Sequence, residues 1–362
     1  MGYIKGINGL RAFAVALVIF QHYIISYFYR SDSSLGSIGV TVFFVISGFL
    51  ITGILIQEKE DVTRSIWDKL IKFYSRRILR IFPIYYLVLS VGFLSGIYWF
   101  SEINKLWHIF YATNIYIFLT GQGTGYTSHF WSLDVEEQFY VIWPALVLLT
   151  PNKHLVELFV VSILLAAVSL TLRPLFGYND LSAYALPFSH FDSLGSGALL
   201  SVFVKKKNQD NLLKIKPYMI ISGVIFTLSI CIIRDLKSDA PGVESALVLM
   251  NAMTIITTCL TIIYISLNQE SKLVKFLEIK FISGIGVISY GLYLYHLLVP
   301  ELFTSTSFSP KDTPSWINVI IYFFTSICIS ILSWLMLERK ILKHKKGFEK
   351  FVRISLLRKR QI

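Results

Sequence analysis

Hydrophobic runs of about 20 residues recur along the whole sequence and constrain the fold more than any other feature. A run of that length can cross roughly 30 Å of hydrocarbon as an α-helix. The 362 residues are 54% hydrophobic and only 15% charged, whereas a soluble domain is about a quarter charged. We therefore predict an all-α, polytopic membrane protein with about ten transmembrane helices. They are placed at residues 6–29, 35–56, 80–100, 129–149, 155–173, 185–204, 217–234, 245–267, 282–303 and 315–337.

The net charge of +12 is distributed as the positive-inside rule requires. With a cytoplasmic N-terminus, the cytoplasmic loops, the tail and the N-terminal end with Lys5 and Arg11 hold 28 of the 34 lysines and arginines, which places both termini in the cytoplasm. Topology and contact with anionic lipid headgroups explain the basic excess, so nucleic acid is not predicted as a partner. We expect a membrane domain at 1–340 and a basic cytoplasmic tail at 341–362. The six basic residues on the other side are Arg30, Lys105, Arg173, Arg234, Lys237 and Lys311.

We expect no metal site, no cleavable signal peptide and no appended soluble domain. Cys231, Cys259 and Cys328 lie in separate apolar runs, without the spacing of metal ligands or of a disulfide framework. The first span is too long for a signal peptide and lacks a small-residue cleavage site. The outer loop at 101–128 is aromatic and then glycine-rich, and we expect a short interfacial or re-entrant segment there.

Two ionisable residues lie in the first predicted span. Arg11 and His22 are eleven residues apart, which on an α-helix is about 20° past three full turns, so both side chains face one side. Arg11 is near the cytoplasmic end, where snorkelling is a sufficient alternative explanation. His22 lies deeper, where it either satisfies a neighbouring helix or transfers protons.

Three carboxylates interrupt the span that contains SHFWSLDVEEQFYVIWP. Asp134 is close to the predicted outer surface, and we expect it to be solvated. Glu137 falls on a largely apolar helical stripe, whereas Glu136 shares its stripe with polar and aromatic residues. Because a carboxylate within the membrane usually faces a bundle interior or a cavity, Glu136 is the predicted functional carboxylate. The other members of its stripe are His129, Ser132, Tyr140 and Trp143.

Two further spans carry ionisable residues at a similar depth. His190 and Asp192 lie near the outer end of the sixth span, and His296 lies about two-thirds of the way across the ninth. A histidine beside a carboxylate is the usual apparatus of general-base catalysis. The pattern predicts a shared cavity about 10 Å below the outer surface, counted along the helices. Its predicted members are His22, Glu136, Asp192 and His296.

An arginine cluster lies at the predicted cytoplasmic mouth of the third span. Arg76, Arg77 and Arg80 fall within little more than one helical turn, with Pro83 in the expected first turn of the span. Ordinary positive-inside anchoring is one explanation. Guanidinium groups also suit phosphate, because arginine forms bidentate hydrogen bonds with it. No Walker loop or dinucleotide-binding glycine pattern is present, so side chains would hold such a ligand.

These segments together resemble the acyltransferase-3 family of integral membrane acyltransferases. The resemblance covers nearly the whole chain in family order, and the run from Trp131 to Tyr140 is its most specific part. It departs at Thr41, where many relatives carry aspartate, and after Glu338, where the usual proline is missing. It implies a short form without the soluble hydrolase-like domain of longer relatives. The matching segments are GLRAFAVALVIFQHY, GVTVFFVISGFLIT, RRILRIFPIYY, HFWSLDVEEQFYVIWP, FDSLGSGALL and YGLYLYH.

The resemblance implies a multi-pass O-acyltransferase of the bacterial inner membrane. Such enzymes move an acyl group, most often acetyl, from acyl-CoA to a hydroxyl of an envelope polysaccharide or lipid-linked oligosaccharide, without a permanently bound cofactor. His22 is the implied catalytic histidine, and Glu136 is the first glutamate of the family motif. The implied acyl-CoA ligands are Arg11, Arg76, Arg77 and Arg80. Supporting or acceptor-binding roles are expected for Ser47, Trp131, Ser132, Glu137, Tyr140 and His296.

The residues alone leave two mechanisms and other function classes open. In one mechanism, His22 deprotonates the acceptor hydroxyl for direct attack on the thioester, with Glu136 or Asp192 orienting the ring. In the other, an acyl-histidine or acyl-serine intermediate forms, with Ser47 and Ser132 as candidates. A proton-coupled transporter would use the same ionisable layer as a relay but needs no coenzyme A site, and a lipid-binding scaffold leaves that layer unexplained. Acceptors still open are O-antigen, exopolysaccharide, peptidoglycan and small sugars.

Overall fold

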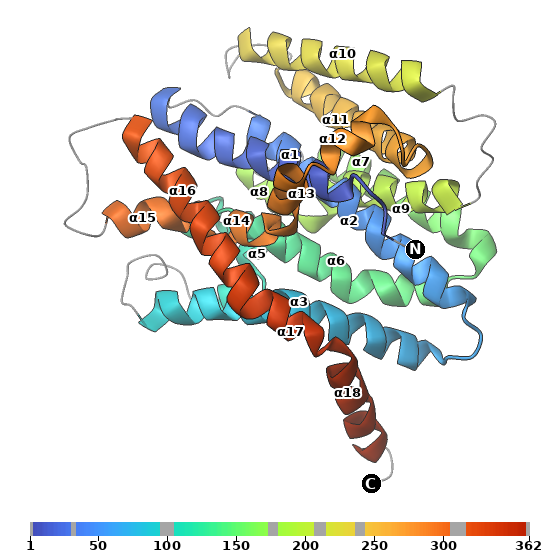
Figure 1. Cartoon of the computed structure of the whole chain (residues 1–362). Helices are drawn as coiled ribbons and strands as arrows, with labels where there is room; N and C mark the ends of the chain where they lie inside the picture. Colours follow the sequence, from blue (N-terminus) through green and yellow to red (C-terminus); the bar gives the residue numbers. More distant parts are fainter. Residues whose placement is uncertain are drawn as a thin grey trace. The chain divides into compact units, whose positions relative to one another are not determined.

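In the computed structural model, all regular secondary structure of the described residues is helical (Figure 1). These residues are 3–29, 34–94, 105–172, 180–205, 215–235, 243–304 and 316–359. The prediction of an all-α, multi-pass membrane protein is confirmed, while the number of about ten spans and the location of the termini stay predictions. Arg30, Arg173, Lys237 and Lys311 lie outside the described residues. Six described segments are long and apolar enough to cross a membrane: Ile7–Ser26, Leu35–Glu60, Ile66–Leu94, Asn152–Ser169, Ser245–Leu267 and Trp316–Lys343.

The chain divides into two compact units that alternate along the sequence. Helix α2, Leu35–Glu60, passes from the first unit into the second at residue 55. The first unit contains Met1–Ile54, Val156–Thr171 and Phe188–Ser289, and the second contains Leu55–Leu155, Leu172–Pro187 and Tyr290–Ile362.

The first unit is built on an apolar core that α2 shares with four other helices. Leu277 of α12, Ile262 of α11, Leu200 of α9 and Ile7 of α1 are all buried in it beside Phe49 of α2. Helix α10 lies alongside α11 (Figure 1). The other helices of this unit are Ile7–Phe20 (α1) with the π-helical Gln21–Tyr29, Leu155–Leu172 (α7), Phe191–Lys205 (α9), Ile215–Asp235 (α10), Val243–Leu267 (α11), Lys272–Leu277 (α12) and Lys280–Val287 (α13).

Glycines allow α2 to approach two of its neighbours closely. A Cβ atom at Gly39 would lie 2.5 Å from the carbonyl oxygen of Ala14 in α1. A Cβ atom at Gly197 in α9 would overlap the carbonyl oxygen of Val45 in α2. Small residues at such crossings are characteristic of membrane helices. Helix α2 therefore contacts both helices of this unit that carry predicted catalytic residues.

Replacing Gly197 by alanine is expected to lower the stability of the detergent-solubilised protein by about 2 kcal/mol, because the added methyl group overpacks the α2–α9 crossing. Thermal unfolding measures the loss. Gly223 in α10 is a matched control, since a Cβ there meets nothing within 4 Å. Gly223→Ala should be neutral or stabilising by up to about 1 kcal/mol. Equal unfolding temperatures for the two variants would contradict the close crossing.

The second unit contains α3, Ile66–Leu94, which contacts both α6, Phe130–Leu149, and α18, Lys345–Lys359. The remaining helices are Lys105–Ile109 (α4), Thr113–Thr120 (α5), Asp180–Ala185 (α8), Ser289–Tyr295 (α14), Leu298–Thr304 (α15), Trp316–Ser333 (α16), the π-helical Trp334–Glu338 and Arg339–Lys343 (α17), with 3-10 turns at Gly125–Thr127 and Asn152–His154. The π-helical segment Trp334–Glu338 and the short helix α17 connect α16 to α18 (Figure 1). A third 3-10 turn, Pro187–His190, leads into α9 of the first unit.

Two predicted spans differ from the helices observed. Helix α3 begins at Ile66 rather than at residue 80, so Pro83 lies in its interior and not in its first turn. Ser65 explains this early start, because its Oγ accepts a hydrogen bond from the backbone N–H of Asp68 (3.1 Å), as a helix N-cap does. The ninth span, 282–303, is wrong as one helix, since it is divided among α13, α14 and α15. Three glycines and a proline in this segment weaken its helical preference.

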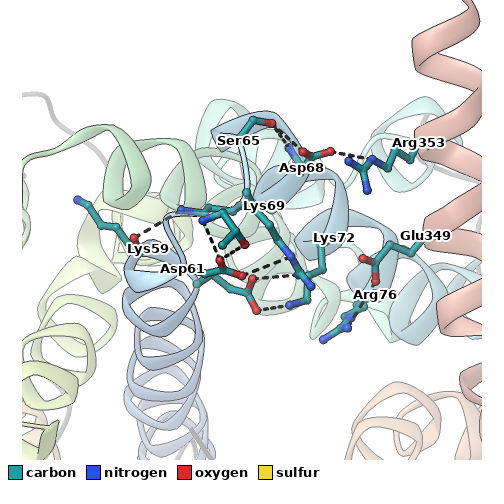
Figure 2. A network of polar contacts seen from close by, with 12 residues as sticks. Lys59, Asp61, Ser65, Asp68, Lys69, Lys72, Arg76, Glu349 and Arg353 are labelled. Atoms are coloured by element: carbon teal, nitrogen blue, oxygen red, sulfur yellow. Dashed lines mark hydrogen bonds and ion pairs between the residues drawn. The ribbon is translucent and has the colours of Figure 1, made fainter.

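Charged side chains connect the ends of α2, α3 and α6, and Figure 2 shows those between α2 and α3. Lys59 near the end of α2 donates from Nζ to the carbonyl oxygen of Val147 in α6 (2.9 Å). Lys69 of α3 donates in turn to the carbonyl oxygen of Lys59 (3.5 Å), and Lys72 forms an ion pair with Glu58. A cation at the carboxyl end of a helix compensates its unpaired carbonyl groups. These contacts fix the beginning of α3, which carries the arginine cluster.

Candidate active site

His22 and Arg11 lie on the first span of the first unit. Arg11 is in α1, and His22 is the second residue of the π-helical segment that follows it; both side chains are partly buried. The α-helical phase that places the two residues on one face holds only as far as Phe20. Single π-helical segments inside α-helices are frequent at functional sites. The change of helix type therefore falls directly beside the predicted catalytic histidine.

Asp192 lies in the first turn of α9 within a line of polar side chains. Its Oδ2 accepts a hydrogen bond from Nδ2 of Asn251 in α11 (2.7 Å). The Oδ1 of Asn251 accepts one from the hydroxyl of Thr41 in α2 (3.0 Å). The other oxygen of Asp192 accepts the backbone N–H of Ser193 (2.5 Å). Three helices thus converge on this carboxylate.

Helix α2 relates the levels of His22 and Asp192. A Cβ at Gly36 would lie 3.2 Å from the side chain of Gln21, which precedes His22. Thr41 follows Gly36 by five residues, or about 7.5 Å along the helix axis. Gln21, which precedes His22, and Thr41, which begins the line to Asp192, thus lie along α2 within about one and a half turns of each other. The common depth of His22 and Asp192 stays a prediction.

Ser47 and His190 are buried in the same unit. Ser47 precedes Gly48, whose Cβ position is filled by the carbonyl group of Leu194, so this serine lies at the α2–α9 crossing. The ring of His190 packs against Phe44, with centroids 5.0 Å apart. The side chains of Ser47 and His190 are thus tightly packed. The role of Ser47 as a nucleophile stays a prediction.

Glu136 lies in the second unit and is held by its own helix. It is partly buried and accepts a hydrogen bond from the hydroxyl of Tyr140, one turn further along α6. The guanidinium carbon of Arg77 lies 4.6 Å from the centroid of the Tyr140 ring, a cation–π geometry. The other members of the predicted stripe, His129, Ser132, Tyr140 and Trp143, are all buried, as are residues on other faces of α6, and the functional role of Glu136 stays a prediction.

The arginine cluster is divided between two sides of α3. Arg77 turns toward α6, where it also approaches the ring of Phe73 (5.8 Å). Arg76 and Arg80 are exposed, and Arg76 forms an ion pair with Glu349 of α18 (3.4 Å; Figure 2). The three guanidinium groups therefore do not form one fork. Arg77 lies against Tyr140, the hydrogen-bond partner of Glu136, whereas Arg76 lies at the exposed surface of α3.

Asp134 is fully buried, so the expectation that it is solvated is wrong. Its Oδ2 accepts the backbone N–H groups of Thr113 (2.7 Å) and Asn114 (3.3 Å) and the Thr113 hydroxyl. The Asn114 side chain bonds in turn to that of Gln138, one turn further along α6 (3.0 Å). Asp134 thus caps α5 from a neighbouring helix, where the N-terminal N–H groups favour a negative charge. The short segment expected at 101–128 contains α5, but its packing over Asp134 was not predicted.

Two histidines meet near the beginning of α6. The rings of His129 and His296 have centroids 4.7 Å apart, and both residues are buried. Tyr293 joins them through hydrogen bonds from its hydroxyl to the carbonyl oxygen of His129 (3.3 Å) and with Ser132 Oγ (2.5 Å). His296 follows the end of α14, where Nδ1 bonds to the carbonyl oxygen of Tyr293 (2.6 Å). Tyr293 was not recognised from the sequence because nothing distinguishes it from neighbouring tyrosines.

His296 lies at the level of His129, not at that of Glu136. Seven residues separate His129 and Glu136 in α6, which is about 10 Å along its axis. The single layer of four ionisable residues predicted from depth is therefore wrong for this pair, because the ninth span is not one straight helix.

The two other predicted supporting residues of α6 are Trp131 and Glu137. Trp131 packs against Tyr184 of α8, with ring centroids 4.9 Å apart. Glu137 is partly buried beside Glu136 in the same turn.

These helices and their polar residues define an α-helical, multi-pass integral membrane protein. A family profile described as an acyltransferase domain matches residues 4–335. The chain belongs to this family, the acyltransferase-3 family, and membership supports an acyltransferase activity. No solved structure matches the chain significantly.

Curated relatives of the chain are named as O-acetyltransferases. It is 28% identical over 374 residues to "O-acetyltransferase OatA" of Staphylococcus aureus (strain NCTC 8325 / PS 47), covering 96% of this chain and 58% of the relative. It is 30% identical over 376 residues to "Peptidoglycan O-acetyltransferase OatA" of Listeria monocytogenes, with 96% and 56% covered. It is 28% identical over 371 residues to "Putative peptidoglycan O-acetyltransferase YrhL" of Bacillus subtilis, with 97% and 56% covered. The chain thus spans somewhat more than half the length of these relatives.

Proposed function

We propose that the protein moves an acetyl group from cytoplasmic acetyl-CoA to a hydroxyl of a cell-envelope carbohydrate. The family match over residues 4–335 is the observation that carries this proposal. Relatives named as peptidoglycan O-acetyltransferases favour the peptidoglycan glycan as the acceptor over exopolysaccharide or O-antigen. The inner membrane of a bacterium is the proposed location, since the donor is cytoplasmic and the acceptor lies outside.

The proposed reaction is direct transfer with His22 as the general base. The imidazole of His22 takes the proton of the acceptor hydroxyl as its oxygen attacks the thioester carbonyl carbon. The carbon–sulfur bond then breaks, and the imidazolium returns the proton to the leaving thiolate, which gives an acetyl ester and free coenzyme A. A carboxylate that orients the ring stabilises the imidazolium. Asp192 belongs to the same unit as His22, which favours it over Glu136 for this role.

The exposed side of α3 supports a site for the phosphates of the donor. Arg76 has a half-exposed side chain, 43% accessible, and its partner Glu349 is 27% accessible. Such ion pairs contribute little to stability, so a phosphate group can replace Glu349 at small cost. Arg80 follows Arg76 by one turn and is also exposed. Arg77 lies against Tyr140, and its proposed role is to hold this ring rather than a phosphate group.

Coenzyme A is expected to raise the unfolding temperature of the detergent-solubilised protein, because it binds the folded state only. Arg76→Ala should weaken coenzyme A binding by roughly tenfold, the effect of losing one hydrogen bond between charged groups. Thermal-shift titrations with coenzyme A measure both quantities.

Arg64→Ala is the matched control for this titration. Arg64 carries the same charge, lies in the short connection before α3, and has the same 43% accessible side chain. Its partners are Glu58 and Asp61, so its loss leaves the arginine cluster intact. Equal weakening in the two variants would show a nonspecific charge effect and contradict a phosphate site at Arg76.

The acceptor is tested by measuring base-labile acetate in the envelope of cells with and without the gene. We expect ester-linked acetate in purified peptidoglycan to fall when the gene is deleted and to return with the wild-type gene. Acetate lost from the extracted polysaccharide fraction instead would assign exopolysaccharide or O-antigen as the acceptor. No change in any envelope fraction would contradict the proposed function.

A further inference from the structure

One line of hydrogen bonds joins three helices of the first unit and ends on the Asp192 carboxylate. It begins at the Thr41 hydroxyl in α2, which is 5% exposed, and passes through the Asn251 side chain of α11. We propose that Asn251 and Thr41 are positioning residues, which fix the Asp192 carboxylate for acetyl transfer. This inference rests on the proposed function, and it adds two residues to which no role is assigned.

The chemistry of the three groups gives the line a single direction. A carboxylate accepts hydrogen bonds and donates none, so the end of Asn251 that faces Asp192 must be its NH₂ group. The carbonyl oxygen of the amide then faces α2, where it needs a donor. The Thr41 hydroxyl supplies that donor at 3.0 Å. The carboxylate therefore selects the amide orientation in which Asn251 donates to Asp192 at 2.7 Å, and the Thr41 hydroxyl holds the amide in it by donating to its carbonyl oxygen.

Both oxygens of Asp192 are fixed by this arrangement. Oδ2 is held by Asn251, and Oδ1 is held by the backbone N–H of Ser193 in the first turn of α9 (2.5 Å). The N-terminal turn of a helix also favours a negative charge. Without Asn251 the carboxylate plane can rotate, and the carboxylate no longer presents one geometry to the reacting groups.

A purely structural explanation is that the line joins three membrane helices, as interhelical hydrogen bonds do. The two explanations predict different kinetics. A structural bond lost from a folded protein changes stability and leaves the turnover of each folded molecule unchanged. A lost positioning bond lowers kcat and leaves the KM for acetyl-CoA unchanged, because Arg76 and Arg80, proposed to bind the phosphates of the donor, lie in the second unit.

Thr41→Val removes the hydroxyl and keeps the shape of the side chain. In membrane vesicles that contain the native acceptor, with labelled acetyl-CoA as donor, we expect kcat per folded protein to fall roughly 10- to 100-fold, the cost of a misplaced group. The KM for acetyl-CoA should stay within about twofold, since donor binding is untouched. Thr41→Ser keeps the donor and should restore most of kcat.

Thr254→Val is the matched control. Thr254 is on α11, three residues from Asn251, is 2% exposed, and donates only within its own helix, to the carbonyl oxygen of Met250 (2.8 Å). Its valine variant should keep the wild-type kcat. A Thr41→Val variant as active as Thr254→Val would overturn the inference while the activity of the wild type upholds the proposed function.

A double-mutant comparison separates a line from two independent contacts. Because Thr41 acts through Asn251, Thr41→Val should lower kcat no further in an Asn251→Ala background. Multiplied losses in the double variant would overturn the proposed direction of the line. A wild-type protein that transfers no label from acetyl-CoA would refute the proposed function, and the inference with it.

Discussion

His22→Ala is expected to reduce acetyl transfer by roughly a thousandfold, the contribution of a positioned general base. Alanine removes the imidazole, and no water molecule held in its place has a comparable basicity. The side chain is only partly buried in its π-helical segment, so the substitution should leave the folded state intact. Label transferred from acetyl-CoA to envelope glycan, per amount of folded protein in membrane vesicles, measures the loss.

Binding of the donor should survive this substitution. The proposed phosphate-binding arginines belong to the second unit and His22 to the first, so coenzyme A should stabilise the His22→Ala protein as it does the wild type. His344→Ala, which removes an exposed histidine at the end of α17, should keep full activity. A His22→Ala protein with more than about a tenth of the wild-type turnover would exclude His22 as the general base.

Properties that depend on one helix were predictable from the sequence. The apolar runs gave the all-helical, membrane-spanning class, and helical phase separated Glu136 from Glu137 before any packing was known. Tyr140, one turn from Glu136, does hydrogen-bond to it. Helix geometry alone predicts this contact, because residues four apart on a helix are neighbours whatever surrounds them.

Properties that depend on which helices pack together were not predictable. Asn251 is a single amide in an apolar run, and nothing in the chain connects it to Thr41, 210 residues away, or to Asp192. Depth counting failed for His296 because it assumed one straight helix where three short helices follow one another. The expectation that Asp134 is solvated failed because the segment before α6, which contains α5, packs on α6 and buries this carboxylate.

The burial of the Asp134 carboxylate leads to a prediction with a large expected effect on stability. Asp134→Ala should destabilise the protein by about 4 kcal/mol, because two backbone N–H groups at the start of α5 lose their acceptor in a buried place. Those groups belong to Thr113 and Asn114, and Asp134 itself is 0% exposed. Thermal unfolding in detergent measures the loss. Asp134→Asn keeps an acceptor oxygen and should cost less.

Asp61→Ala is the control for the role of burial. Asp61 also accepts a backbone N–H, that of Thr63 (3.0 Å), together with the Thr63 hydroxyl. These bonds hold the pKa of Asp61 below its usual value. The turn is exposed, so water replaces the carboxylate when it is removed, and the unfolding temperature should change little. If Asp134→Ala and Asp61→Ala were equally mild, Asp134 would not be the cap that holds the outer segment on α6. If only Asp134→Ala is severe, a carboxylate that the sequence predicts to be solvated has a structural role instead.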